Sequence, residues 1–411
     1  MPIYYLHLAL AGLRRAPWLP ALMVLSLAVG VAASMTTLTL RHALSLDPIP
    51  DASTRLFNLR DPAGSLRGRM FSYADAMALG RLGGARIQSV LSGTGVTTAV
   101  AVAGQRRVLR GGLGIRYATA SFFSVFEVSL QQGRVWSSEE ERAAAPVAVL
   151  DEDMAHYLFG STPAVGRQIR LGDVAYTVIG VTARWNPQPR YYDLDGVAGA
   201  FGGGGDGVFV PLTTMRYAPD DLMVSRACPM DQAGMMKPSG LPDSGCQWLS
   251  VWYLAATRED AKGFAGELPA SLARVLPADT ARRLRLLDVR QLLVKAGVVP
   301  SSVRVYTWLG MAFLALCLLN AAGMQLSRVL RAASQVGIRR ALGASRAQIV
   351  GQHLCDALLI GGIGGALGAG MTFAALAAVR HLPDVYYAEL VRMDGTMLLA
   401  MLGLVLASGV L

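Results

Sequence analysis

Charged residues are scarce in this chain of 411 residues. Only 16% of the residues are Asp, Glu, Lys or Arg, whereas 53% are hydrophobic, and the mean hydropathy is +0.40. Soluble globular domains contain roughly 25% charged residues. The deficit argues against an ordinary soluble enzyme and indicates segments that lie in a lipid bilayer.

Motifs for nucleotide binding, metal binding and nucleophilic catalysis are also missing. The dipeptide Gly-Lys does not occur, and the glycine run at 202–205 lacks the lysine that would reach a phosphate. The five histidines are scattered without ligand spacing, and no Gly-x-Ser-x-Gly motif occurs. We therefore expect no catalytic residue, no metal ligand and no cofactor bound directly by this chain.

Lysine is rare as well, so arginine supplies most of the net charge of +10. A basic chain can bind nucleic acid. Here the arginines do not form one long run, and no nucleic-acid-binding motif accompanies them. We expect no nucleic-acid partner.

The chain has only four cysteines, and they lack the Cys-x-x-Cys spacing of redox and zinc sites. Cys317 and Cys355 lie in or beside apolar runs, whereas Cys228 and Cys246 lie in a polar stretch rich in Gly and Pro. Outside the cytoplasm, an oxidising environment favours a disulfide between Cys228 and Cys246. Two free, buried thiols are the alternative.

Four uncharged apolar runs are candidates for membrane spans, because about 20 residues cross a bilayer as a helix. These runs are residues 18–40, 305–326, 357–379 and 395–411. The sequence stops inside the fourth run, which is short for a crossing, so we expect that helix to be truncated. The first run follows Arg14 and Arg15 and also resembles a cleavable signal peptide, but its length favours an uncleaved anchor.

Arginine positions predict the orientation through the positive-inside rule. Two arginines precede the first run, and the link between the second and third runs contains no acid and five arginines, Arg328, Arg331, Arg339, Arg340 and Arg346. The N-terminus and this link are therefore predicted to be cytoplasmic. The long segment between the first two spans is predicted to lie outside the cytoplasm.

These observations divide the chain into eight segments. They are an interfacial helix (1–17), a first transmembrane helix (18–40), an external α/β domain with two subdomains (41–302), a second transmembrane helix (303–326), a cytoplasmic link (327–352), a third transmembrane helix (353–380), a short external loop (381–394) and a partial fourth transmembrane helix (395–411). Tyrosines in the first segment favour an interfacial helix, and the alternative is that this segment begins the first span. Subdomain seams are expected near residues 115 and 245.

Local patterns predict helices and strands in the external domain. Ser72 and Asp75 have the spacing of a helix start. Residues 146–150 are typical of a buried strand, and residues 152–159 of a short helix that ends at Gly160.

Further along, residues 167–171 and 174–181 flank a two-residue turn and predict a hairpin. Residues 257–287 are predicted to form a polar helix. Residues 190–207 are expected to form a long flexible loop, and residues 216–246 a second irregular stretch.

The cytoplasmic link predicts a short helix, a sharp corner and a second helix. Gly343 is a natural stop for the first helix. Ser345 and Gln348 form a capping-box pattern that begins a helix leading into the third span.

The short helix has one apolar face. Ile338, Ala341 and Leu342 share this face at helical spacing, whereas Arg339 and Arg340 lie off it. An apolar face in the cytoplasm needs a cover, which a soluble partner would supply. Packing on the protein's own membrane base is the alternative.

The third apolar run contains two glycine pairs at small-xxx-small spacing, Gly361 with Gly365 and Gly364 with Gly368. This spacing lets helix backbones approach closely in a bilayer. We expect a partner helix in the same chain or across a dimer. Simple tolerance of glycine in membrane helices is the alternative.

The stretch from Gly337 to Ser345 resembles the hallmark of MacB/FtsX-type permeases. Where that family often has a glutamate two residues before the glycine, this chain has Gln335, and Asp356 keeps an acid where the family tends to have glutamate. The external segment resembles the family's periplasmic core domain at Phe122-Phe123, Gly133-Arg134, Glu139-Glu140, 147–150, Phe159-Gly160, Val165-Gly166 and 178–181.

The resemblance implies four transmembrane helices with a large mixed α/β extracytoplasmic domain between the first two, built from a pair of βαβ-like units and a smaller β-rich unit. It implies a multi-pass protein of the bacterial inner membrane that works as a dimer, with a second copy or a paralogue. It also implies a separate cytosolic ABC ATPase that binds the ATP. The residues that would couple to this ATPase are Gly337, Ile338, Arg339, Arg340, Ala341, Leu342, Gly343 and Ser345.

Three classes of function remain open. The first is a non-catalytic ABC transporter permease that exports or extracts an antimicrobial peptide, an antibiotic or a lipoprotein, with a periplasmic adaptor protein and membrane lipid as further partners. The second is a signalling subunit that regulates a periplasmic enzyme such as a cell-wall hydrolase and transports nothing. The third is a membrane-anchored external enzyme. The large external domain favours the first class.

Overall fold

A computed structural model describes most of the chain. The described residues are 18–63, 70–83, 87–102, 105–197, 199–201, 205–229, 236–331, 333–341, 343, 345–381 and 393–410. The chain divides into two compact units. We call Met1–Leu46 with Val299–Leu411 the membrane unit, and Asp47–Val298 the external unit. The predicted interfacial helix over 1–17 lies outside the described residues.

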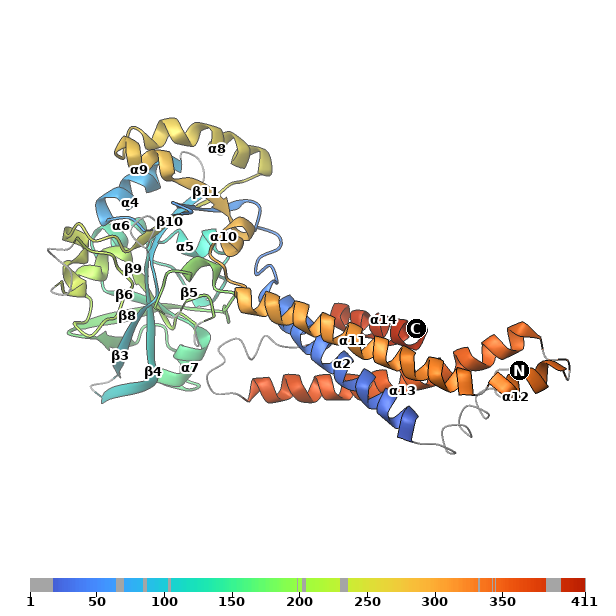
Figure 1. Cartoon of the computed structure of the whole chain (residues 1–411). Coiled ribbons are helices and arrows are strands. Elements are labelled where there is room, and N and C mark those ends of the chain that lie inside the picture. The colour runs from blue at the N-terminus through green and yellow to red at the C-terminus, as the bar shows by residue number, and fades with distance from the viewer. Residues whose placement is uncertain are drawn as a thin grey trace. The chain divides into compact units, whose positions relative to one another are not determined.

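The membrane unit is helical (Figure 1). Its helices are α2 (Trp18–Leu44), α11 (Ser301–Arg331), α12 (Ala333–Ala341), α13 (Arg346–Arg380) and α14 (Gly395–Val410). Among the described residues, α2, α11 and α13 are long and apolar enough to cross a bilayer, and α14 is a shorter apolar helix. Three of the predicted spans therefore have a matching helix, and the fourth span stays a prediction.

Two of these helices extend well beyond the apolar runs that predicted them. α13 begins at Arg346 and α11 continues to Arg331, both inside the predicted link 327–352. An apolar run marks only the part of a helix that lipid can surround, and polar residues continue the same hydrogen-bonded helix at its ends. The predicted link thus consists of α12 and the ends of two long helices.

A mixed sheet of 11 strands is the frame of the external unit. Its strands are β1 (Leu56–Arg60), β2 (Ile87–Ser92), β3 (Gly95–Val102), β4 (Gln105–Ala118), β5 (Leu130–Gly133), β6 (Val147–Leu150), β7 (Gln168–Leu171), β8 (Val174–Thr182), β9 (Val208–Pro211), β10 (Leu249–Leu254) and β11 (Arg285–Asp288). The external helices are α4 (Tyr73–Gly80), α5 (Phe122–Val125), α6 (Ser138–Arg142), α7 (Glu152–Phe159), α8 (Arg258–Leu272), α9 (Ala278–Arg283) and α10 (Val289–Lys295), with 3-10 helices η1 (Arg81–Gly83), η2 (Tyr191–Asp193), η3 (Leu212–Tyr217) and η4 (Pro238–Asp243).

Six of the strands close into a ring. They pair in the order β4, β3, β7, β8, β6, β9, and β9 pairs again with β4. β6 lies parallel to β8, β4 lies parallel to β9, and the other pairings of the ring are antiparallel. From β4 the sheet continues through β2, β10 and β1 to β11 with antiparallel pairing only. Closure leaves the ring strands without free edges.

Hydrophobic clusters cover both faces of the sheet. In β10, Val251 and Tyr253 join one cluster, whereas Trp252 between them joins the other. This is the strand alternation that sends successive side chains to opposite faces. Helices α4 and α8 contribute side chains to the first cluster, and α5 and α10 to the second.

Several local predictions are confirmed. The β6 strand is buried along its whole length, and α7 covers 152–159 and ends at Gly160, which has φ 63°. β7 and β8 pair antiparallel as the predicted hairpin. Ser72 caps α4 by accepting a hydrogen bond from the Asp75 backbone N–H.

Two predictions about the strands and helices of the external unit are wrong. The seam near residue 115 falls inside β4, which continues to Ala118 and pairs with β9 there. The predicted helix over 257–287 is two helices, α8 and α9, followed by the strand β11. Residues 285–287 leave the helix because β1 offers them a pairing partner, and tertiary pairing overrides local propensity.

Candidate functional site

Gly343 and Ser345 are the described residues between α12 and α13, and residues 342 and 344 lie outside the described part of the chain. Gly343 has φ 97°, a conformation that favours glycine, and its N–H donates to the Arg340 carbonyl at 3.1 Å. Ser345 then begins α13 with a capping box. The Gln348 N–H donates to the Ser345 hydroxyl at 3.3 Å, and the Ser345 N–H donates to the Gln348 side-chain oxygen at 3.0 Å. Satisfied terminal groups hold the start of a helix in place.

Several residues of α12 are exposed in the part of the chain that the structure describes. The Ile338 side chain is 62% exposed, and Gly337, Arg340 and Ala341 are also exposed. Leu342 and the side chain of Arg339 lie outside what the structure describes. For the described part of the predicted apolar face, packing on the protein's own membrane base is therefore not observed.

Glycines bring α13 into close contact with α2. A Cβ atom added to Gly364 would lie 3.0 Å from the Leu27 Cβ, and one added to Gly368 would lie 2.8 Å from the Val31 Cβ. Gly361 is buried in the same helix. The structure thus places the Gly364/Gly368 pair in a contact within the chain.

Gly365 lies on another side of α13, where an added Cβ would overlap Val405 of α14. α2 and α11 meet in the same manner, because a Cβ on Gly30 would lie 3.0 Å from the Cys317 Cβ. The Ser34 hydroxyl donates to the Gly310 carbonyl at 2.8 Å across this contact. Small residues and interhelical hydrogen bonds hold helices together where lipid removes the hydrophobic effect.

A hydrogen bond joins the end of α2 to the start of α14. His42 Nε2 lies 2.9 Å from Asp394 Oδ2. Asp394 also accepts hydrogen bonds from the Met397 N–H and the Thr396 hydroxyl. These hydrogen bonds, together with the one from His42, lower the pKa of Asp394 to about 2. The carboxylate is therefore ionised at neutral pH and caps α14.

Four charged side chains form a buried ion network in the external unit. Arg116 Nε lies 2.9 Å from Asp206 Oδ2, and Arg190 Nη2 lies 2.8 Å from Asp206 Oδ1. Asp193 lies 3.2 Å from Arg116 and 3.4 Å from Arg190. The Thr94 hydroxyl donates to the Asp206 carboxylate at 2.6 Å. All four charged side chains are at most 1% exposed, and their formal charges sum to zero.

The network keeps its charges because its members compensate one another. Burial raises the pKa of Asp206, but Arg116 and Arg190 outweigh it and bring the pKa below its ordinary value. The Tyr192 ring lies under both guanidinium groups, 4.9 and 5.5 Å from their central carbons. The prediction of a flexible loop at 190–207 is therefore wrong for Arg190, Asp193 and Asp206, which buried ion pairs join to β4 and to one another. Residues 198 and 202–204 of this segment lie outside the described residues.

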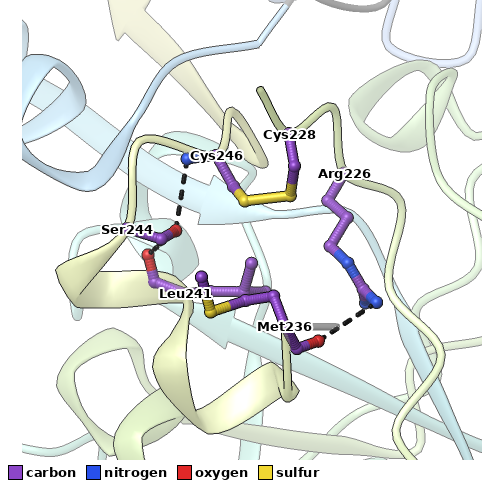
Figure 2. The surroundings of a disulfide bond; sticks show 6 residues. All are labelled: Arg226, Cys228, Met236, Leu241, Ser244 and Cys246. Atoms are coloured by element: carbon purple, nitrogen blue, oxygen red, sulfur yellow. Dashed lines mark hydrogen bonds between the residues drawn. A yellow bond between two sulfur atoms is a disulfide. The ribbon is translucent and has the colours of Figure 1, made fainter. Parts of the chain in front are cut away.

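A disulfide joins Cys228 and Cys246, with an S–S distance of 1.98 Å (Figure 2). Around it, the Cys246 N–H donates to the Ser244 hydroxyl at 3.2 Å, and the Ser244 hydroxyl donates to the Leu241 carbonyl at 2.8 Å. Cys246 is fully buried. The bond closes a loop in the stretch 216–246, whose described residues form short 3-10 helices and isolated β-bridges.

Two family matches together cover most of the chain. The MacB-like periplasmic core domain matches residues 21–233, and the FtsX-like permease C-terminal region matches residues 309–411. The chain belongs to the MacB/FtsX-type ABC transporter permease family. It is a membrane protein with a large extracytoplasmic domain, which is the external unit.

Curated relatives of this permease carry the name macrolide export ATP-binding/permease protein MacB. The relative from Shewanella sp. (strain ANA-3) is 25% identical over 368 residues, which are 86% of this chain and 49% of the relative. The relative from Azoarcus sp. (strain BH72) is 25% identical over 389 residues, which are 92% of this chain and 53% of the relative. The chain thus spans about half the length of the curated relatives it matches.

A solved structure also resembles the permease. The crystal structure of the periplasmic region of MacB from Actinobacillus actinomycetemcomitans is 14% identical, with a TM-score of 0.37. The match covers 59% of this chain and 93% of that one. The low TM-score adds nothing to the family assignment, which rests on the two family matches.

The permease also contains contacts that its sequence did not indicate. The Ser34–Gly310 contact and the His42–Asp394 pair join residues more than 270 positions apart in the chain. A single glycine within a run of large residues, such as Gly310, was the available signal. Among the described residues, no group of three or more His, Cys, Asp or Glu side chains could hold a metal ion.

Proposed function

We propose that this permease couples ATP binding and hydrolysis on a cytosolic ABC ATPase to movement of its external unit in the bacterial inner membrane. The family assignment and the names of its relatives, which include ATP binding and export, support the proposal. The printed sequence contains no phosphate-binding loop. In this proposal a partner chain supplies the ATPase.

The main support for the proposal is the exposed side chain of Ile338 on α12. Ile338 is 62% exposed on a helix that the arginine distribution assigns to the cytoplasm. An exposed apolar side chain beside arginines suits a groove on a partner that has apolar walls and an acidic rim. Burial of such a side chain contributes roughly 1.5 to 3 kcal/mol to an interface.

The corner next to α12 would transmit displacement. In this proposal the short link through Gly343 and the capped start of α13 at Ser345 is stiff, and α13 continues as one helix for 35 residues. α13 packs closely on α2 through Gly364 and Gly368. A movement of the docked α12 would therefore reach α2, which continues in sequence into the external unit.

Further partners and the cargo belong to the same proposal. The permease would act as a dimer, with a second copy or a paralogue, and would hand its substrate to a periplasmic adaptor protein. The class of substrate is an antimicrobial peptide, an antibiotic or a lipoprotein. The macrolide export named for its relatives supports efflux over the other functions.

The test replaces Ile338 by a charge. The tagged chain is purified from the membranes of its native host, and the co-purifying ATPase is identified by mass spectrometry and by ATP hydrolysis. Ile338→Asp would bury an unpaired carboxylate at the contact, which costs several kcal/mol. We expect loss of the ATPase by at least about tenfold, with normal insertion in the membrane.

Ile87→Asp is the matched control. Ile87 is also exposed, at 45%, but it lies in β2 of the external unit. This variant should keep the ATPase and its activity. If Ile338→Asp retained the ATPase as well as Ile87→Asp does, α12 would not be the docking element.

A further inference from the structure

A groove opens on the external unit beside β7. Its volume is about 570 Å³, within the range of roughly 300 to 1,000 Å³ that small-ligand sites occupy. The lining residues come from the ends of β3 and α7 and from β7 and β8, and they are Ala101, Val102, Phe159, Arg167, Gln168, Ile169, Arg170 and Ala175.

The floor of the groove consists of small side chains. Ala101 of β3 pairs with Arg170 of β7, and Arg170 pairs in turn with Ala175 of β8. Side chains of directly paired residues lie on the same face of a sheet. Two alanines thus flank Arg170 and leave room above the strands on either side of it.

Both arginines of the groove are held by contacts that leave their charge unbalanced. The Arg167 guanidinium carbon lies 5.1 Å from the centre of the Phe159 ring. Arg170 donates from Nη2 to the Asp173 backbone carbonyl at 3.0 Å. A ring face and a carbonyl position a guanidinium without supplying a negative charge.

None of the described residues that line the groove carries a carboxylate. Among the described residues, neither Arg167 nor Arg170 has an acidic side-chain oxygen within 4.0 Å. Both arginines and Gln168 are exposed. The remaining five lining residues are apolar, so the groove combines two exposed guanidinium groups with apolar walls and one amide.

We propose that this groove binds an acidic peptide segment with alternating apolar side chains. Guanidinium groups pair with carboxylates through two parallel hydrogen bonds. The Gln168 amide can both donate to and accept from a peptide backbone. The volume of about 570 Å³ and the apolar lining residues exceed what a single phosphate would fill. The proposal goes beyond the ATPase coupling and does not depend on the α12 contact.

The test measures binding of a defined peptide to the full chain in phosphatidylcholine nanodiscs. The probe is a fluorescein-labelled peptide of alternating Leu and Asp, and the comparison peptide alternates Leu and Lys. We expect the acidic peptide to bind, with an affinity that falls as salt is raised, and the basic peptide not to bind. Equal binding of both peptides would overturn the proposal.

Variants locate the binding. Arg167→Glu with Arg170→Glu should lower the affinity at least tenfold, about 1.4 kcal/mol. Arg274→Glu with Arg282→Glu makes the same change of net charge at exposed positions around α8 and α9, and it should leave the affinity within about twofold. An equal loss in both double variants would show that only the overall charge matters and would refute the groove.

Two further measurements complete the test. Ala175→Trp places a large side chain on the floor of the groove, at an exposed position and without a change of charge. It therefore tests peptide binding in the groove even if the double arginine variant does not fold. It should abolish binding, and unchanged binding would refute the proposal. Displacement of the peptide by phosphatidylglycerol vesicles or by inorganic phosphate at constant ionic strength would assign the groove to a lipid or an anion and overturn the peptide assignment.

Discussion

The external unit and the membrane unit are each stabilised internally by different interactions. The external unit buries hydrophobic clusters on both faces of a sheet and can enclose the ion network of Arg116, Arg190, Asp193 and Asp206. The membrane unit relies on backbone approach at Gly30, Gly364 and Gly368 and on the Ser34–Gly310 hydrogen bond. The difference follows from the solvent, because water drives apolar burial and lipid does not.

The largest effect is expected from breaking the ion network. Asp206→Ala would remove one of the two carboxylates that Arg116 and Arg190 share and leave one buried positive charge uncompensated, which costs about 3 to 5 kcal/mol. Thermal unfolding of the purified chain should show a strongly destabilised external unit with intact membrane helices. Asp206 has a lowered pKa, so its contribution is present above the ordinary aspartate pKa and is lost as the pH falls through the folded-state pKa.

Asp220→Ala is the control for this change. Asp220 pairs with Lys237 at 2.7 Å, but the two side chains are 68% and 69% exposed. Exposed pairs contribute about 0 to 1 kcal/mol. If Asp220→Ala destabilised the unit as much as Asp206→Ala, burial would not be what makes the network important.

A smaller effect is expected from separating two membrane helices. Gly368→Leu would push α13 away from Val31 and Ala28 of α2, at a cost of about 1 to 3 kcal/mol for overpacking. Gly370 lies two residues further along α13 and has no atom within 4 Å of an added Cβ. Gly370→Leu should therefore be tolerated. Unfolding midpoints in detergent compare the two variants, and equal midpoints would contradict close packing at Gly368.

The smallest effect concerns one carboxyl group in the external unit. Burial, followed by the nearby acids Asp153, Asp206 and Glu152, raises the pKa of Asp151 to about 7. The folded state therefore holds a proton that the unfolded state releases near pH 4, so stability falls as the pH rises from about 4 to about 7. Asp151→Asn removes this dependence and keeps the cap of α7, since Asn is also a good N-cap.

We expect Asp151→Asn to stabilise the external unit at pH 8 by on the order of 1 kcal/mol. Denaturation curves between about pH 4 and pH 8 would show a flatter profile. Asp153→Asn is the comparison, because the Asp153 side chain is 71% exposed on the same helix. A steep profile that survived in Asp151→Asn would assign the pH dependence to another group.

Local signals in the sequence were sufficient for local structure. The β7–β8 hairpin, the stop of α7 at Gly160 and the capping box of Ser345 each depend on residues at most a few positions apart. The apolar runs likewise located α2, α11 and α13, because lipid imposes one simple requirement on each helix alone.

Contacts between distant segments could not be predicted in the same way. Segment 190–207 resembled a flexible loop because its glycines favour many conformations. Its residue Asp193, however, is paired with Arg116, in a strand about 75 residues earlier. Residues 285–287 have helical neighbours but pair with β1. At α12, the sequence identified the exposed Ile338 but not whether the chain itself would cover it.

The disulfide between Cys228 and Cys246 reports the side of the membrane on which the external unit folded. Both other cysteines, Cys317 and Cys355, are free and belong to the membrane unit. Disulfides form outside the cytoplasm and are rare within it. A chain that inserted in the reverse orientation would therefore keep four thiols, whereas one that delivered the external unit correctly would keep two. Counting thiols on the unfolded protein thus distinguishes the two orientations without any label on the surface.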